Sequence, residues 1–397
     1  MRKQTVRDID LDGKTVLLRA DFNVTFVPGR TEISDDSRIR ATLPTIEYLL
    51  NQNASIVLCS HLGRPKGKVT PQLRMHPVSA RLAEVLGRRI LQGSEPTGTD
   101  IRSTIDSMAG GEIVILENLR FSPGEERNDM AFAQELASLA DVYVNDAFGA
   151  AHRAHASTEG VTHFLPSVAG LLMERELEML GTVLESPRHP LVFIVGGAKV
   201  SDKLQIVERF IGRASTLLVG GGMAATFLKS KGLEVGDSLV EDDFVERARE
   251  ILNSSEKNET TVLLPLDVIV SSDFAADAPS HLVNVSCIES GWRIMDIGPR
   301  TAELYAKALS DAETVVWNGT MGVSEWPRFS GGTKRLAEAL AAQQQAITVI
   351  GGGSTADAVA SLGFADKMTH VSTGGGASLE FLEGKELPGV AGLMDAE

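Results

Sequence analysis

Glycines follow apolar, strand-like runs at five places in the second half of the chain. The five segments span residues 193–197, 217–222, 315–319, 349–353 and 371–376. Beyond the carboxyl ends of parallel strands, glycine lets the backbone approach a ligand, and helix N-termini direct N–H groups at anions. One such glycine usually makes only a tight turn, but five of them together predict a phosphate-binding edge of a sheet.

Arginines in the first half follow predicted strand ends. Arg64, Arg120 and Arg153 lie just beyond strand-like segments, and each guanidinium offers a planar fork that matches a phosphate or a carboxylate. Taken singly, such an arginine would be interpreted as a solvated surface charge or as the partner of an acid. Arg38 is the arginine most open to that interpretation, because it lies in a predicted loop, residues 31–39, with two aspartates.

Composition and motif tests exclude several other classes of protein. The formal net charge of −15 argues against nucleic acid or an anionic membrane as the main partner. The two cysteines are far apart in apolar stretches, so we expect neither a disulfide nor a cysteine metal site. The G-x-x-x-x-G-K-[ST] and G-x-G-x-x-G motifs are missing, which disfavours the common nucleotide folds. Without a long apolar run or an apolar start, a cytoplasmic location is expected.

The length of 397 residues predicts two domains, because a single hydrophobic core stops growing before that size. In the first half, short β-branched runs alternate with helical periodicity, which predicts an α/β domain with a parallel sheet. The predicted strands are residues 15–20, 55–59, 112–116 and 141–145, and the predicted helices are 40–51, 77–87 and 130–140. A longer helical pattern, Leu171–Glu185, precedes the second series of strands and is the predicted connector.

Several motifs occur in a fixed order along the chain. In the first half they are Arg19-Ala20-Asp21-Phe22-Asn23-Val24, Ser60-His61-Leu62-Gly63-Arg64-Pro65, Glu117-Asn118-Leu119-Arg120, Asn145-Asp146-Ala147-Phe148-Gly149 and His152-Arg153-Ala154-His155. In the second half they are Gly196-Gly197-Ala198-Lys199-Val200-Ser201-Asp202-Lys203, the triple glycine before Met223, Trp317-Asn318-Gly319 and Ser372-Thr373-Gly374-Gly375-Gly376-Ala377-Ser378. Their order resembles that of the phosphoglycerate kinase family.

The resemblance implies two Rossmann-like, three-layer α/β domains with parallel sheets, joined by a hinge helix across a cleft. It implies a glycolytic phosphotransferase with a carboxyl acceptor, which reversibly transfers the acyl phosphate of 1,3-bisphosphoglycerate to MgADP, giving 3-phosphoglycerate and MgATP. The expected parts are a 3-phosphoglycerate domain (1–170), a hinge helix (171–186), a nucleotide domain (187–380) and a carboxyl-terminal segment returning to the first domain (381–397). A monomer that closes its domains for in-line transfer is expected, with Mg²⁺ carried by the nucleotide.

Residue roles carry over from the family motifs. The matching substrate-binding residues are Asp21, Phe22, Asn23, Arg38, His61, Leu62, Gly63, Arg64, Arg120 and Arg153, of which the arginines and His61 would form a basic wall. The matching nucleotide-binding residues are Lys203, Gly221, Ile294, Asn318, Glu325, Gly351, Gly352, Gly353 and Ser354. The matching catalytic residues are Arg38, Lys199, Gly353 and Gly375. Without the resemblance, the two lysines would be interpreted as exposed charges in the first turn of a helix.

Ser354 departs from the family pattern, which has an aspartate after this triple glycine. That aspartate would be the magnesium ligand, and a neutral hydroxyl is a weaker one. Ser354 could ligate weakly or through water, Asp357 could reach in from the next turn, or Ser354 could mainly cap a helix. A catalytically weakened nucleotide- or phosphoglycerate-binding protein of the same fold is the alternative function. A dinucleotide oxidoreductase is disfavoured because its fingerprint is missing.

Overall fold

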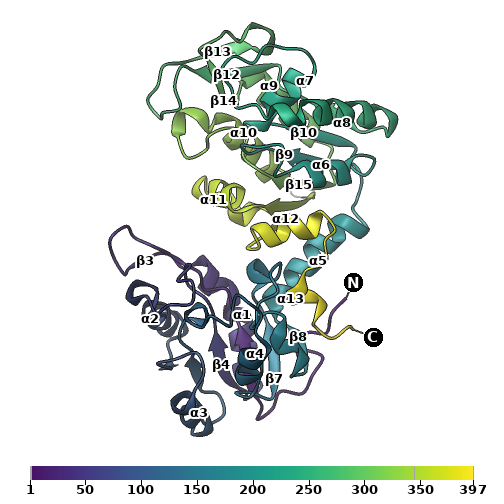
Figure 1. Ribbon diagram of the computed structural model, residues 1–397. Helices are drawn as coiled ribbons and strands as arrows, with labels where there is room; N and C mark the ends of the chain where they lie inside the picture. The colour runs from purple at the N-terminus through teal and green to yellow at the C-terminus, as the bar shows by residue number, and fades with distance from the viewer. Residues whose placement is uncertain (1, 344, 397) are drawn as a thin grey trace. The chain divides into compact units, whose positions relative to one another are not determined.

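The chain divides into two compact units in the computed structural model, which describes residues 2–343 and 345–396 (Figure 1). One unit comprises Met1–Glu178 with Lys385–Glu397, and the other comprises Met179–Gly384. The boundary falls within helix α5 (Leu171–Glu185), whose ends agree with the predicted ones. Each unit contains a six-stranded sheet of parallel strands, so the predicted α/β class is confirmed.

The sheet of the first unit has the strand order β5-β6-β4-β1-β7-β8. Its strands are β1 (Thr15–Arg19), β4 (Ser55–Cys59), β5 (Leu91–Gln92), β6 (Ile113–Ile115), β7 (Val142–Asn145) and β8 (Ser167–Ala169). A short antiparallel pair, β2 (Thr25–Phe26) and β3 (Ile33–Asp35), lies outside it. The helices are α1 (Ser37–Asn51), α2 (His76–Leu86), α3 (Thr99–Asp106), α4 (Met130–Ala137) and α13 (Pro388–Ala391). The four predicted strands are all present, within one residue at each end.

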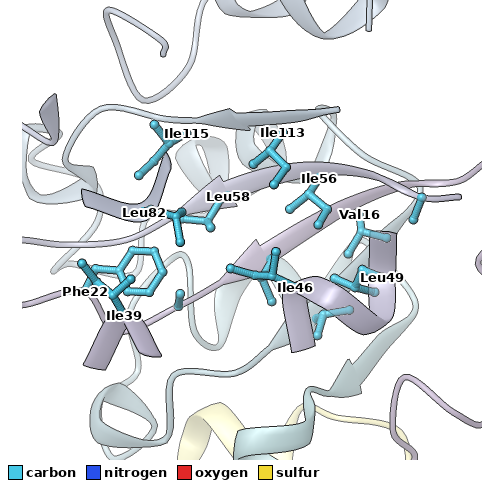
Figure 2. Packing of buried hydrophobic residues seen from close by; sticks show 14 of the residues in the cluster. Val16, Phe22, Ile39, Ile46, Leu49, Ile56, Leu58, Leu82, Ile113 and Ile115 are labelled. Atoms are coloured by element: carbon cyan, nitrogen blue, oxygen red, sulfur yellow. The ribbon is translucent and has the colours of Figure 1, made fainter. Parts of the chain in front are cut away.

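Helices α1 and α2 pack their apolar faces on this sheet. Figure 2 shows the contact, in which the helical side chains face strand residues Val16, Ile56, Leu58, Ile113 and Ile115. The helical side chains are Ile39, Ile46 and Leu49 of α1 and Leu82 of α2. Burial of each such side chain contributes about 1.5–3 kcal/mol. Because Ile39 extends the apolar face by a turn, α1 begins at Ser37, and the prediction that Arg38 lies in a loop is wrong.

The two ends of the chain lie side by side in the first unit (Figure 1). Lys3 donates from Nζ to the carbonyl of Leu393 over 2.8 Å and to the carboxylate of Asp395 over 2.7 Å. Asn145, the last residue of β7, donates to the carbonyl of Gly389 in α13 over 2.8 Å. The carboxyl-terminal segment is thereby bonded to a sheet strand that is distant in sequence.

The sheet of the second unit has the strand order β11-β10-β9-β15-β16-β17. Its strands are β9 (Leu191–Val195), β10 (Thr216–Val219), β11 (Thr261–Leu263), β15 (Thr314–Asn318), β16 (Ile347–Gly351) and β17 (His370–Val371). The five glycine-ending segments are therefore five adjacent strands. The helices are α6 (Leu204–Phe210), α7 (Met223–Ser230), α8 (Val245–Lys257), α9 (Pro299–Leu309), α10 (Gly331–Ala341), α11 (Gly353–Ser361) and α12 (Gly376–Leu382). A small antiparallel sheet, not predicted, contains β12 (Asp267–Ser271), β13 (Ser280–Asn284) and β14 (Arg293–Ile297).

Buried aspartates distant in sequence cap three of the helices. Asp146 accepts hydrogen bonds from the N–H groups of Leu172 and Met173 at the start of α5, over 2.9 and 3.2 Å. In the second unit, Asp267 caps α9 and Asp296 caps α10 in the same manner. Burial raises the pKa of Asp146 to about 7, against the opposing effect of these hydrogen bonds.

We predict that Asp146→Asn changes how the stability of the protein depends on pH. Between the ordinary aspartate pKa and about 7, the folded wild-type protein holds a proton that the unfolded chain has lost. Wild-type stability should therefore fall as pH rises through this window, by up to about 1.4 kcal/mol per pH unit, and Asp146→Asn should lack that contribution. Urea unfolding from about pH 5 to 8 measures it. Asp129→Asn, which removes the charge of the exposed α4 cap but keeps a capping oxygen, is the matched control, and parallel curves for wild type and Asp146→Asn would contradict the prediction.

Candidate active site

Charged and polar side chains gather at one edge of the first unit's sheet. Four strand ends are followed by such residues: Asp21 after β1, His61 after β4, Arg120 after β6 and Arg153 after β7. These strands are parallel neighbours in the order β6-β4-β1-β7, so their carboxyl ends lie at the same edge. The sheet therefore brings together residues that the sequence separates widely.

Arg38 reaches this edge from the first turn of α1. Its Nη1 group donates to Oδ2 of Asp21, which is largely buried. Burial opposes the ionisation of Asp21, but its interactions with His61, Arg38 and Arg19 outweigh burial and hold the pKa of that carboxyl below its usual range. The side chain of Arg38 is still 37 % exposed, so it keeps donors for an anionic ligand.

His61 is buried at the same edge of the sheet. Burial is the largest cause that lowers the pKa of His61 well below its usual value; the Asp21 carboxylate opposes this, and three surrounding arginine charges lower the pKa further. Those charges belong to Arg19, Arg120 and Arg153. The lowered pKa favours a neutral ring that offers a hydrogen bond at this position, while the arginines supply the positive charge of the predicted wall.

The turn that contains Gly63 is held from two sides. Its N–H donates to Oδ1 of Asn23 over 2.8 Å, and its carbonyl accepts from Nη1 of Arg120 over 2.8 Å. Arg120 is itself buried, with its Nε 3.2 Å from a carboxylate oxygen of Glu126. Arg120 thus organises the turn as well as adding charge. Arg64, which follows Gly63 in the chain, is exposed.

Phe22 and Leu62 contribute their side chains to the core. Both are at most 1 % exposed and belong to the cluster between the sheet and α1 (Figure 2, which labels Phe22). Their backbones join the site's framework, since Phe22 donates its N–H to Oγ of Ser60 and Leu62 donates to Oδ1 of Asn118. Only backbone atoms of these two residues are left to meet a ligand.

Lys203 and Asn318 meet at the carboxyl ends of two adjacent strands in the second unit. Lys203 donates from Nζ to Oδ1 of Asn318, and burial lowers the pKa of Lys203 in spite of nearby acidic groups. Nδ2 of Asn318 is buried without a hydrogen-bond partner in the described part of the chain. A Cβ placed on Gly351 or Gly352 would lie 3.2 or 3.5 Å from this nitrogen. A lysine charge, an open amide donor and a glycine turn therefore meet, as an anion site requires.

Lys199 lies in the loop between β9 and α6, and Lys203 directly precedes α6. Both lysines are thus outside the helix, and their interpretation as charges within its first turn is wrong. The loop is fixed by Ser201, which donates to the carboxylate of Glu241 from its N–H over 2.9 Å and from its hydroxyl over 2.6 Å. The side chain of Lys199 is exposed on this fixed loop.

The glycines at these strand ends form two groups. In the first, backbone packs against backbone: a Cβ on Gly221, whose φ is +63°, would lie 2.5 Å from the amide nitrogen of Gly197. The turns that follow β9 and β15 approach each other in the same manner. In the second group, a Cβ on Gly353 or Gly375 would meet no described atom within 4 Å. Glycine in the first group is required by the protein's own packing, and only the second group leaves backbone open to a ligand.

Ser354 is the second residue of α11, because the helix begins at Gly353 with Gly352 as its N-cap. The interpretation of Ser354 as an N-cap is therefore wrong. Ser354 and Asp357, one turn later, are both exposed. Across residues 2–343 and 345–396, no group of three or more His, Cys, Asp or Glu side chains could hold a metal. A Mg²⁺ here would need nucleotide oxygens besides these side chains, which fits how Mg²⁺ binds in nucleotide sites.

Known proteins match this chain over its whole length. Residues 6–385 match the sequence model of a family described as phosphoglycerate kinase. The chain is 52% identical over 395 residues to a phosphoglycerate kinase of Moorella thermoacetica and 53% identical to one of Pelotomaculum thermopropionicum, with 100% of each chain covered. The chain belongs to the phosphoglycerate kinase family. Its activity is that of the family, a phosphotransfer to a carboxyl group, with ATP binding and a place in glycolysis.

Solved structures of the family agree with the fold. A phosphoglycerate kinase from Coxiella burnetii gives a TM-score of 0.88 at 38% identity, and one from Pyrococcus horikoshii OT3 gives 0.85 at 34%. Each comparison covers 98% of both chains. The two parallel sheets described above are thus those of a phosphoglycerate kinase. In the described residues, no helix is long and apolar enough to cross a membrane.

Two positions that family motifs assign to the nucleotide lie away from the glycine turns in sequence. Ile294 is in β14 of the small antiparallel sheet, and its N–H donates to Oγ of Ser238 over 2.9 Å. Its backbone amide is therefore already bonded within the protein. Glu325 is exposed in the turn after β15, beside Trp326.

Sequence reasoning assigned no role to three buried residues beside His61, at the polar edge of the first unit's sheet. Arg19, Glu125 and Ser157 are each at most 1 % exposed, and hydrogen bonds join them in a chain that ends at His61. Arg19 gave a signal, since it stands in a quoted motif as the charged last residue of an apolar strand. Glu125 and Ser157 gave none, because nothing in the sequence pairs two residues so far from Arg19.

Proposed function

We propose that the first unit binds 3-phosphoglycerate and 1,3-bisphosphoglycerate, and that the second unit binds MgADP and MgATP. The observation that supports this most is the collection of arginines around neutral His61 at one sheet edge of the first unit. The guanidinium groups of Arg38, Arg120 and Arg153 at this edge suit a ligand that carries a phosphate and a carboxylate. In the second unit, Lys203 beside the open amide of Asn318 suits nucleotide phosphates.

In the proposed roles, Arg38 and Lys199 stabilise charge on the transferred phosphoryl group. Phosphoryl transfer needs in-line positioning and stabilisation of the equatorial oxygens more than it needs covalent help from the protein. Lys199 is exposed on a fixed loop, and the space where a Cβ of Gly353 or Gly375 would lie is open, so the phosphoryl oxygens can approach each of these positions. A general base is unnecessary, because the attacking atom is a phosphate or carboxylate oxygen.

The proposed roles also require the two substrates to meet. Because each has its own unit, transfer needs a hinge motion that brings the reacting atoms within about 3–3.5 Å. We propose α5 as the hinge, since the boundary between the compact units falls inside it. Action as a cytoplasmic monomer, as the family resemblance implies, is part of the proposal.

Magnesium enters as part of the nucleotide substrate in this proposal. When bound, Mg²⁺ neutralises charge on the nucleotide oxygens. Ser354 would approach it with a hydroxyl oxygen from the exposed first turn of α11, and Asp357 would approach from the next turn. A hydroxyl is a poorer magnesium ligand than a carboxylate, so the magnesium requirement should be higher than an aspartate at this position would give.

A steady-state assay of ATP-dependent phosphorylation of 3-phosphoglycerate, titrated with magnesium, tests the proposal. We expect wild-type turnover, and we expect Ser354→Asp to lower the magnesium concentration for half-maximal rate by about tenfold at most, with little change in kcat. Ser354→Ala is the matched variant and should raise that concentration if the hydroxyl is a ligand. If Asp357→Asn raises it and Ser354→Ala does not, Asp357 is the ligand instead. Turnover seen only in Ser354→Asp would favour a binding protein.

A further inference from the structure

Arg19 lies at the centre of a buried hydrogen-bond chain beneath the proposed 3-phosphoglycerate site. It is the last residue of β1 and is 1 % exposed. Its Nε donates to Oγ of Ser157 over 2.8 Å, its Nη1 donates to the carbonyl of Ala20, and its Nη2 lies 3.1 Å from Nδ1 of His61. All three guanidinium nitrogens are thus engaged inside the protein, which leaves Arg19 poorly placed to bind a ligand itself.

The charge of Arg19 is balanced through Ser157. The Ser157 hydroxyl donates to Oε1 of Glu125 over 2.6 Å, and its N–H donates to Oε2 over 3.0 Å. Glu125 is fully buried, so its carboxylate would be costly without these partners. A positive group, a bridging hydroxyl and a negative group therefore form a closed unit, and the guanidinium stays fixed in one orientation.

The contact between Arg19 and His61 determines where the imidazole proton lies. A guanidinium has five N–H donors and no acceptor, so Nδ1 of His61 must accept. A neutral imidazole that accepts at Nδ1 has its proton on Nε2. Asp21 does not accept a hydrogen bond from Nδ1 of His61, because its Oδ1 is 3.9 Å from that nitrogen.

We infer that Arg19 is a positioning residue that fixes His61 as the neutral tautomer with its proton on Nε2. His61 then presents one neutral N–H donor to the carboxylate or phosphate of the substrate, among arginines that supply the charge. This inference rests on the proposed function for the identity of that substrate, and the tautomer itself does not depend on it. The arrangement separates two tasks, because the arginines attract the anion and His61 contributes a directional hydrogen bond.

Nitrogen-15 NMR of the histidine-labelled, full-length wild-type enzyme tests the tautomer without any variant. We expect the His61 ring to show a protonated Nε2 and an unprotonated Nδ1, unchanged from about pH 5.5 to 8. A proton on Nδ1, or a doubly protonated ring at neutral pH, would overturn the inference. Signals are assigned by the loss of one ring in His61→Gln.

The Arg19→Met variant tests the positioning role. Without the donor to Nδ1, the His61 signals should shift toward a mixture of tautomers, and KM for 3-phosphoglycerate should rise about tenfold or more while KM for ATP stays unchanged. Ser157→Ala is the matched variant: it removes the bridge to Glu125 but keeps the contact of Arg19 with His61, so the tautomer should persist even if stability falls. Loss of the tautomer in Ser157→Ala, or its retention in Arg19→Met, would overturn the role. If 3-phosphoglycerate leaves the wild-type ring signals unmoved, His61 does not contact the substrate, and the proposed binding mode fails while the tautomer stands.

Discussion

Arg38→Ala is expected to lower kcat for the phosphorylation of 3-phosphoglycerate by about 10²–10³-fold, the usual result of removing one donor that stabilises transition-state charge. Arg38 is anchored through Asp21, yet its side chain keeps over a third of its surface exposed. It therefore has one donor bound to the protein and others open to a ligand. A steady-state assay with both substrates varied measures the effect, and KM for ATP should hardly change.

The same substitution also leaves the largely buried carboxylate of Asp21 without its ion-pair partner, so part of any loss could come from misfolding. The double variant Arg38→Ala with Asp21→Asn separates the two causes. It removes the unpaired charge, so its unfolding free energy should recover toward that of the wild type, while kcat stays low. Recovery of kcat together with stability would mean that Arg38 serves only to balance Asp21, and would contradict its proposed catalytic role.

Much of the fold follows from local patterns in the sequence. Ser55–Cys59 matches the observed β4 because it is a short, almost continuous apolar run, and Leu171–Glu185 matches α5 because it has a helical period between Gly170 and Pro187. The five strands that run into glycine form adjacent strands of one sheet. Parallel, doubly covered strands are apolar throughout, so they are easy to recognise in a sequence.

The unpredicted parts depend on long-range contacts. The short strand β5 has two residues, too few for any period to be visible. The antiparallel sheet of β12, β13 and β14 was missed because one of its two outer strands, Ser280–Asn284, is mostly exposed and lacks an apolar pattern.

In the candidate site, too, features carried by local motifs could be predicted and features that depend on long-range contacts could not. Exposed or half-buried arginines could be predicted from family motifs, because the motifs preserve residue types. The neutrality of His61 could not, since it follows from burial and from three arginines that the fold brings near. Likewise, the chain from Arg19 through Ser157 to Glu125 links residues far apart in sequence. Sequence patterns therefore name the residues of this site better than they give its charges.

A pair of glycine substitutions should have opposite effects on stability and activity. Gly221→Ala is expected to destabilise the second unit by about 2–5 kcal/mol, because its Cβ would lie 2.5 Å from a backbone nitrogen and its φ is +63°. Gly353→Ala should leave stability unchanged or raise it by up to about 1 kcal/mol, because it begins α11 with an open surrounding and ordinary φ. Urea unfolding of both variants measures this.

Of the same two variants, Gly353→Ala, which should keep its stability, is the one expected to lose activity through a direct effect on the nucleotide. If nucleotide phosphates approach the turn before α11, the methyl group of Gly353→Ala occupies the space of their oxygens and displaces them by about an ångström, which can cost about 10²-fold in kcat/KM for ATP. KM for 3-phosphoglycerate should not change. A Gly353→Ala enzyme with full activity would contradict the proposed phosphate contact, since nothing described in the protein needs glycine there. Folded and active Gly221→Ala would instead contradict the packing argument, because two backbones cannot keep their present contact with a methyl group between them.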